Sequence, residues 1–314
     1  MVKRINGGLS IILLLAILAL FSFYGCGTTQ LTPTENTWAG MQIEQLSQTQ
    51  LQQMLADSIT IYKTINSYQY DIVTGTTSNV TGGSSPWYMS MDTVMSGATN
   101  IEADQTHMYL NMSVLFTGMG AKDESSAIIY DIYAIDNWVY MNMAATGMGS
   151  QWLKVAMSDY LRQTLNLNAV DRQIKPLETP TKVEYLRTEI FNGVNCYVLS
   201  ISPSLENLGD WLNEQDTSSK NLNWRDVVTD ANVFNNFSLL CYLTADTNQL
   251  AGMALDMAVT ISPTTAGVSN ATFTSMLMSV KMNMQLYDVN VPYSLTLPAE
   301  AKLANEVSED IFKN

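Results

Sequence analysis

The stretch LQQMLADSITIYKTINSYQYDIVTGT, residues 51–76, contains the change of period that decides the fold. Up to residue 65 its apolar side chains recur at the spacing of a helix face, and from Tyr68 onward they alternate with polar residues as in a strand. The helix face begins upstream and comprises Ile43, Leu46, Leu51, Met54, Leu55, Ser58, Tyr62 and Ile65. The pattern predicts an amphipathic helix over residues 43–66, with a capping box from Ser47 and Gln50, that covers a β-sheet.

Strand-like alternation continues almost to the end of the chain. It is found in residues 68–76, 87–95, 100–116, 127–135, 138–143, 152–157, 183–191, 194–201, 237–245, 250–261 and 272–289. Asn192-Gly193 is the strongest short hairpin signal. Helical patches are predicted over residues 158–165 and 204–214, and residues 215–235 are irregular. The fold class is therefore α+β, with a strongly curved antiparallel β-sheet, a half-barrel of about ten strands, covered on its concave face by helices.

The N-terminus predicts the location of the protein. Lys3 and Arg4 precede an apolar run that ends in Phe-Tyr-Gly-Cys at residues 23–26. This is the pattern of a lipoprotein signal peptide over residues 1–25, with Cys26 as the lipidated residue. Polar residues 26–39 form a tether, and a single domain is expected over residues 40–314. The protein is then lipid-anchored on the extracytoplasmic side of a membrane of the bacterial cell envelope; the rival interpretation is an uncleaved membrane helix.

Composition excludes several classes of function. Charged residues are 14% of the chain and the formal net charge is −14, which argues against a nucleic-acid partner. His107 is the only histidine, and it falls on the polar side of a strand, so we expect a surface residue there. With one histidine, the chain lacks the residues that histidine-dependent catalysis and metal sites usually require. We therefore expect no enzyme, no metal and no cofactor.

Methionine is concentrated on strand faces. The chain has 19 methionines, and residues 108–116, 253–261 and 276–286 place many of them at alternate positions. The side chains predicted to line an apolar cavity are Met108, Met112, Met141, Met143, Met253, Met257, Met276, Met278, Met282 and Met284. Methionine is unbranched and polarisable, and it adapts to guests of varied shape. Two other interpretations stay open: an ordinary core, and copper(I) bound by Met-x-Met pairs.

Several motifs together resemble a known family. They are the helix and first strand of residues 51–76, the hairpin VEYLRTEIFNGVNCYVLSI (183–201), the pair YLTADTNQLAGMALDM (242–257) and the close LYDVNVPYSLTLPAEA (286–301). With Cys26 they are similar in order and pattern to the LolA-like superfamily, and within it to lipoproteins of the LppX and LprG type. The resemblance implies a half-barrel closed by helices around an apolar cavity.

The same resemblance implies a function. It points to binding of the acyl chains, such as palmitate, of a lipid, glycolipid or lipoprotein, and to their transfer. The alternative is a ligand-free envelope interaction or sensory domain that binds a protein partner, with an exposed apolar edge or groove near residues 205–235.

Two cysteines besides Cys26 lie in apolar strands. Cys196 and Cys241 are either two buried thiols or, if their strands are neighbours, the two halves of a disulfide.

Overall fold

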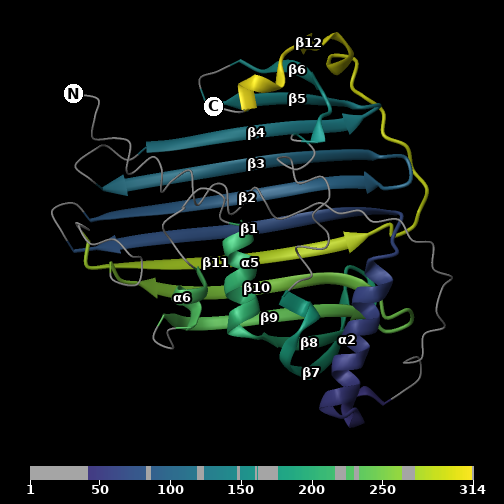
Figure 1. Cartoon of the computed structure of the whole chain (residues 1–314), viewed down its shortest axis with the longest axis vertical. Helices are drawn as coiled ribbons and strands as arrows, with labels where there is room; N and C mark the ends of the chain where they lie inside the picture. Colours follow the sequence, from purple (N-terminus) through teal and green to yellow (C-terminus); the bar gives the residue numbers. More distant parts are fainter. Residues whose placement is uncertain are drawn as a thin grey trace.

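The computed structural model describes residues 42–82, 86–118, 124–146, 149–159, 161, 176–215, 224–229, 233–263 and 273–312. The predicted signal peptide, Cys26 and the tether lie outside these residues, as does most of the helical patch predicted over 158–165. The described residues form one 12-stranded sheet, in the order β12-β6-β5-β4-β3-β2-β1-β11-β10-β9-β8-β7 (Figure 1). Neighbouring strands are antiparallel except for the parallel pair of β12 and β6. Within this described sheet β12 and β7 are the two edges, so the sheet is open.

The strands correspond closely to the alternating segments of the sequence. Their bounds are β1 Ser67–Thr81, β2 Trp87–Asn100, β3 Gln105–Gly118, β4 Glu124–Ile135, β5 Trp138–Ala145, β6 Gln151–Ala156, β7 Pro180–Phe191, β8 Val194–Pro203, β9 Phe234–Thr244, β10 Leu250–Ile261, β11 Ser275–Tyr287 and β12 Asn305–Glu306. The prediction of about ten strands is corrected to twelve, because β12 is a two-residue pairing that alternation cannot reveal. The Asn192-Gly193 hairpin is confirmed, and both residues have the positive φ that a tight turn requires.

The helices are α2 Gln48–Tyr62, α5 Leu205–Gln215 and α6 Trp224–Thr229, with 3₁₀ turns η1 Ile43–Gln45, η2 Ala301–Leu303 and η3 Glu309–Phe312. The capping box is confirmed, because Gln50 N donates to Ser47 Oγ at 3.4 Å and Ser47 N donates to Gln50 Oε1 at 2.9 Å. The long helix therefore begins at Gln48 rather than at residue 43. Five of its six buried side chains belong to the predicted face, and Ile59 is the addition: Leu51, Met54, Leu55, Ser58, Ile59 and Tyr62.

Strand β1 lies between a strand from early in the sequence and a strand from late in the sequence. It pairs with β2 on one side and with β11 on the other along almost its whole length. The methionine-rich strand β11 is thereby placed at the centre of the sheet, with Met284 opposite Ile72 and Met278 opposite Ser78. Two segments about 200 residues apart in the sequence thus share one continuous surface.

Helices α2, α5 and α6 lie on one side of the sheet (Figure 1). We call the sheet face that they contact the helix face, and the opposite one the outer face. Helix α2 contacts β7 and β10, and α5 packs against α6. These helices lie over the half of the sheet formed by β7 to β11, so their cover of a whole concave face stays a prediction.

Candidate functional site

The helix face carries two large apolar clusters. The α2 cluster joins Leu51, Met54 and Leu55 of the helix to Ile72, Met95, Leu110, Leu199, Met253 and Met284 of the sheet. The α5–α6 cluster joins Leu208, Leu212, Trp224, Val227 and Val228 to Met89, Met257, Val259, Ile261 and Met278. The two clusters lie toward opposite ends of the same strands, since β10 and β11 each contribute methionines to both clusters (Figure 1). Helices that are remote in sequence therefore cover one surface at two places.

Nine of the ten methionines named from the sequence contribute to buried clusters of this face. Met108, Met141, Met253, Met282 and Met284 belong to or pack against the α2 cluster, and Met257, Met276 and Met278 belong to or pack against the α5–α6 cluster. Met112 forms a smaller cluster with Met91. The exception is Met143, which is 42% exposed. It lies toward the end of β5, and its partner in β6 is Gln151, the first residue of that short strand.

These methionines are closely packed. Met253, Met257, Met278 and Met284 are only 2–5% exposed. An empty cavity beside a side chain leaves part of its surface accessible, so values this low mean contact with protein atoms on nearly every side. The interior is therefore filled at these positions, and a guest molecule must displace side chains to enter. Methionine is suited to such movement because its unbranched chain adopts several shapes at small cost.

Between the two clusters lies a less buried region that we call the central strip. It consists of Phe237, Leu255, Val280 and Met282, on strands β9 to β11. All four are apolar and partly buried, and Phe237 and Leu255 pack against both clusters. The strip thus marks where the helix face is covered least completely by α2 on one side and by α5 and α6 on the other.

In register with the strip, β1 and β2 present hydroxyl groups where apolar side chains are expected. Thr74 lies opposite Met282 and Thr76 opposite Val280, and Thr93 of β2 lies opposite Thr74. Ser78 continues the same column of β1 and is flanked by Met89 and Met278. We call these four residues the hydroxyl track; all of them are buried.

Two hydroxyls of the track have no hydrogen-bond partner among the residues that the structure describes. Ser78 is 0% exposed and Thr93 is 2% exposed, yet neither Ser78 Oγ nor Thr93 Oγ1 is hydrogen-bonded. Thr99 Oγ1 is a third such hydroxyl, nearer the end of β2 that pairs with Tyr68. Most buried polar groups in proteins are paired, so these exceptions require an explanation. Sequence reasoning missed the track because it searched for apolar alternation, although hydroxyl residues at 74, 76 and 78 continue the same period.

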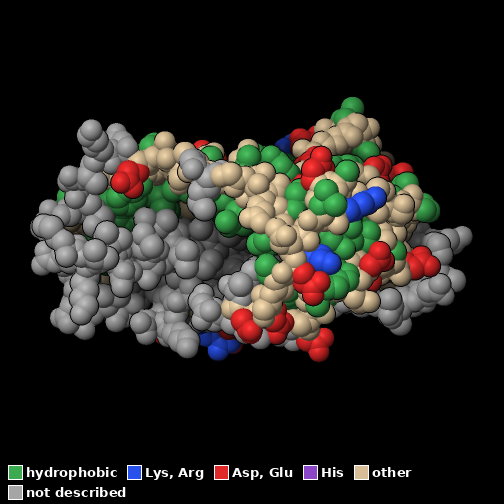
Figure 2. Space-filling model, turned by 90° about the horizontal axis from the view of Figure 1, so that it is seen from above, with side chains coloured by type: hydrophobic (Ala, Val, Ile, Leu, Met, Phe, Trp, Pro, Cys, Tyr) green, Lys and Arg blue, Asp and Glu red, His purple; other side chains and the backbone are tan. Residues whose placement is uncertain are grey.

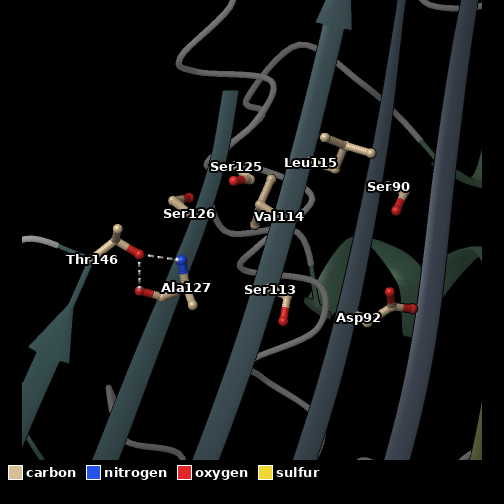
Figure 3. A pocket seen from close by; sticks show the side chains of 9 residues that line it. All are labelled: Ser90, Asp92, Ser113, Val114, Leu115, Ser125, Ser126, Ala127 and Thr146. Atoms are coloured by element: carbon tan, nitrogen blue, oxygen red, sulfur yellow. Dashed lines mark hydrogen bonds between the residues drawn. The ribbon is translucent and has the colours of Figure 1, made fainter. Parts of the chain in front are cut away.

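A groove of about 260 Å³ lies on the outer face (Figure 3). Two cross-strand rows line it, Ser90–Leu115–Ser125 and Asp92–Ser113–Ala127, together with Val114, Ser126 and Thr146. Most of these side chains are exposed, and Asp92 is the only ionisable residue that lines the groove. An open hydroxyl surface with one carboxylate has neither the apolar enclosure for an acyl chain nor the ligand set for a metal.

His107 also lies on the outer face. Its Nε2 is 2.8 Å from Asp131 Oδ1, and its ring stacks on Tyr133 with a centroid distance of 4.2 Å. The surface placement expected from the sequence is confirmed, since the side chain remains about a quarter exposed. Among the residues that the structure describes, no group of three His, Cys, Asp or Glu side chains could hold a metal ion. The described methionines of the helix face occupy apolar clusters rather than an isolated ligand set.

The disulfide alternative is wrong for Cys196 and Cys241, because both thiols are free and buried. Strands β8 and β9 are neighbours, but their register sets Cys196 opposite Thr244 and Cys241 opposite Leu199. Cys241 therefore joins the α2 cluster on the helix face. Cys196 instead belongs to a small separate cluster with Val198, Tyr242 and Ala251, against which Phe191 packs. Burial raises the pKa of the Cys196 thiol to about 11 and raises that of Cys241 further.

Charged side chains are sparse, and several of the basic ones form ion pairs on the surface. Arg225 contacts Asp210 at 2.7 Å and Glu206 at 3.0 Å, and Lys281 lies 3.3 Å from Asp256. On the face shown in Figure 2, acidic side chains are scattered and basic ones are few. No helix among the described residues has the length and apolar character needed to cross a membrane.

The fold and site define a class: a large, open, mostly antiparallel sheet with one apolar, methionine-rich face that helices cover in part. No protein-family model matches the sequence, and no curated protein matches it. Among solved structures, the chain is similar to LprF from Mycobacterium bovis, with a TM-score of 0.41 and 11% identity over 80% of this chain and 98% of that one.

It is also similar to the Mycobacterium tuberculosis lipoprotein LppX, with a TM-score of 0.39 and 11% identity over 80% of this chain and 100% of that one. A DUF1329 family protein from Desulfovibrio piger has a TM-score of 0.22 and 10% identity over 80% of this chain and 96% of that one. The solved structures that are similar to this chain thus include lipoproteins of the LppX type named from the sequence, and the likeness carries no conclusion about function.

Proposed function

We propose that this chain is an extracytoplasmic lipoprotein whose single LolA-like domain, residues 40–314, binds acyl chains of a lipid, glycolipid or lipoprotein on the helix face. Signal peptidase removes residues 1–25, and the lipidated Cys26 anchors the tether to its membrane. The observation that supports this best is the continuous methionine-rich face with a partly exposed apolar strip between two helix-covered clusters. An acyl chain enters along that strip and replaces contacts that the methionines now make with one another.

The filled interior is compatible with a carrier. A 16-carbon acyl chain gains on the order of 10 kcal/mol from burial at about 0.8 kcal/mol per methylene. A bilayer supplies a similar gain, so transfer needs only a near-balance between the two environments. Methionines that close over the site when it is empty keep apolar surface away from water, and they move aside when the chain arrives. This movement of the methionine side chains allows both uptake and release of the acyl chain.

Native mass spectrometry of the full-length lipidated protein, purified from its own membranes, tests the proposal. We expect a fraction of the protein to carry non-covalent adducts with masses of acyl lipids. The variant Val280→Glu places a charge in the central strip and should abolish the adducts. Leu277→Glu is the matched control, since Leu277 lies on the same strand but is exposed on the outer face. Protein that is free of adducts in every preparation, and that takes up no lipid from vesicles, would overturn the proposal.

A protein partner is the second candidate, supported by the edge strand β7. Ile190 is 76% exposed, and Leu186 and Val194 nearby are exposed as well. The sequence placed an apolar edge or groove near residues 205–235; Leu208 and Val227 of that segment are buried, Leu205 is exposed, and residues 216–223 and 230–232 lie outside the described residues. Strand β7 is a further exposed apolar edge, which can pair with an added strand of a partner. Capture of one dominant envelope protein by wild type, and its loss in Ile190→Ser, would favour this function.

A further inference from the structure

The outer face of strands β3 to β6 carries a group of partly exposed aromatic side chains. They point to this face because the residues that alternate with them along each strand belong to the α2 cluster on the helix face. The group consists of Tyr109, Tyr133, Trp138, Tyr140 and Trp152. It lies on the side of the sheet opposite to α2, α5 and α6, so packing against those helices does not account for the rings.

Strand pairing arranges these rings in two neighbouring rows, together with side chains that can form hydrogen bonds. The first row is His107, Tyr133, Tyr140 and Lys154, and the second is Tyr109, Asp131, Asn142 and Trp152. The His107 and Tyr133 rings stack at a centroid distance of 4.2 Å, and the Tyr133 and Trp152 centroids are 6.0 Å apart. Lys154 Nζ lies 4.6 Å from the centroid of the Trp138 ring. We call the two rows and Trp138 the aromatic platform; its contacts hold the rings in place while part of each side chain stays accessible.

One polar atom of the platform lacks a hydrogen bond. Asn142 Oδ1 is buried, and it has no partner among the residues that the structure describes. It lies in register between Asp131 and Trp152, in the middle of the second row. Most buried polar groups in proteins are paired, so an unpaired amide oxygen within a partly exposed row indicates where a ligand can donate a hydrogen bond.

The groove of Figure 3 extends the platform along the same strands. Ser113, which lines the groove, is four residues beyond Tyr109 on β3, or about 14 Å at a rise of about 3.4 Å per residue. Asn111 lies between them on the same face. The groove contributes serine and threonine hydroxyls and the carboxylate of Asp92. The combined surface therefore has aromatic rings toward one end of the strands and hydroxyl groups toward the other.

This combination restricts the chemistry of a ligand. A pyranose ring presents C–H groups on its faces and hydroxyls around its edge, so it can stack on an aromatic ring while it donates and accepts hydrogen bonds. An acyl chain has no hydroxyl to offer Asn142. A polyanion is opposed by the formal net charge of −14, and the platform has only Lys154 as a permanent cation. A neutral glycan matches the rings, the hydroxyls and the charge.

We infer that the aromatic platform and the groove beside it bind a neutral glycan chain. Sugar rings stack on Tyr109 and Trp152, a sugar hydroxyl donates to Asn142 Oδ1, and the chain continues into the groove. This site lies on the face opposite to the proposed acyl site, and it does not depend on the proposed function. An anchored protein with such a face can hold a glycan of the envelope and an acyl ligand at the same time.

Calorimetric titration of the full-length lipidated protein, in a detergent without a sugar head group, tests the inference. The probes are cellohexaose, mannohexaose, chitohexaose and neutral polysaccharide from the walls of the cells that make the protein. We expect the protein to bind at least one of them, with an affinity that changes less than about twofold between about 50 and 500 mM salt. Trp152→Ala should weaken binding by about tenfold, and Asn142→Leu by about fivefold.

Tyr287→Ala is the matched control, because Tyr287 is a partly exposed tyrosine on the outer face of β11, away from the platform. It should bind the glycan as wild type does, and all three variants should keep a cooperative urea transition. Failure of the wild-type protein to bind any probe, or an equal loss in Tyr287→Ala and Trp152→Ala, would overturn the inference. Capture of a protein through the platform without glycan binding would overturn it as well. Glycan binding by a protein that takes up no acyl lipid would uphold it and overturn the proposed function alone.

Discussion

Thr93→Val should stabilise the ligand-free protein. The substitution replaces a hydroxyl by a methyl group of nearly the same size, so the packing around Thr93, which is 2% exposed, is kept. An unsatisfied buried hydroxyl costs about 1–3 kcal/mol, and removing it should return part of that free energy. We expect the free energy of unfolding to rise by about 1 kcal/mol and the melting temperature by about 2–4 °C.

The assay is urea unfolding of delipidated protein, followed by tryptophan fluorescence, with the midpoint and slope fitted for each variant. Thr77→Val is the control, because its side chain lies on the outer face of β1 and is partly exposed. We expect that variant to change stability by less than about 0.5 kcal/mol. Destabilisation of Thr93→Val by 1 kcal/mol or more would show that the hydroxyl has a partner in the folded protein and would refute this reasoning.

Three further outcomes follow from the packing. Gly97→Ala should lower the free energy of unfolding by about 1–3 kcal/mol, because a Cβ there would come within 2.5 Å of the buried Tyr70 hydroxyl. Gly149→Ala is the control and should be nearly neutral, since a Cβ at that position has no heavy atom within 4 Å. Ser47→Ala removes one half of the capping box and should cost about 1 kcal/mol, measured by the same urea unfolding; no loss would mean that α2 does not need the cap. Burial raises the pKa of Cys196 from 9.0 to about 11, so with rising pH the thiol loses its proton in the unfolded chain before it does so in the folded protein. The contribution of Cys196 to the free energy of unfolding should therefore be fully present below pH 9 and should be lost as the pH rises through 11. A flat profile over that range, once the contribution of Cys196 is isolated with Cys196→Ala, would contradict this effect.

Local patterns predicted the elements well because each depends on residues close in sequence. The period of two along residues 68–76 and the Asn192-Gly193 turn are properties of the chain itself, and both are confirmed. The capping box of Ser47 and Gln50 is another such property. Nine of the ten methionines named from the sequence lie in or against buried clusters, while their role in lining a ligand cavity stays a prediction.

Relations between distant strands could not be read in the same way. The first strand was predicted to end at residue 76, but β1 extends to Thr81. Pairing with β11 and β2 supplies hydrogen bonds along this extension, and burial of Ser78 between two methionines follows from the partners rather than from its own neighbours. The buried hydroxyls of the track could therefore not be found by a search for apolar side chains.

The sequence by itself determined the helix and strand periods, the turn chemistry and the methionine content of one sheet face, because these follow from backbone geometry and side-chain type over a few residues. Only the tertiary structure decided that Cys196 and Cys241 lie in different clusters, since strand register assigns each side chain to a face. It also decided that β11 lies beside β1, that the methionines pack closely, and that unpartnered hydroxyls lie among them. Each of these depends on which distant segments come together, and that choice is made by the free energy of the whole sheet.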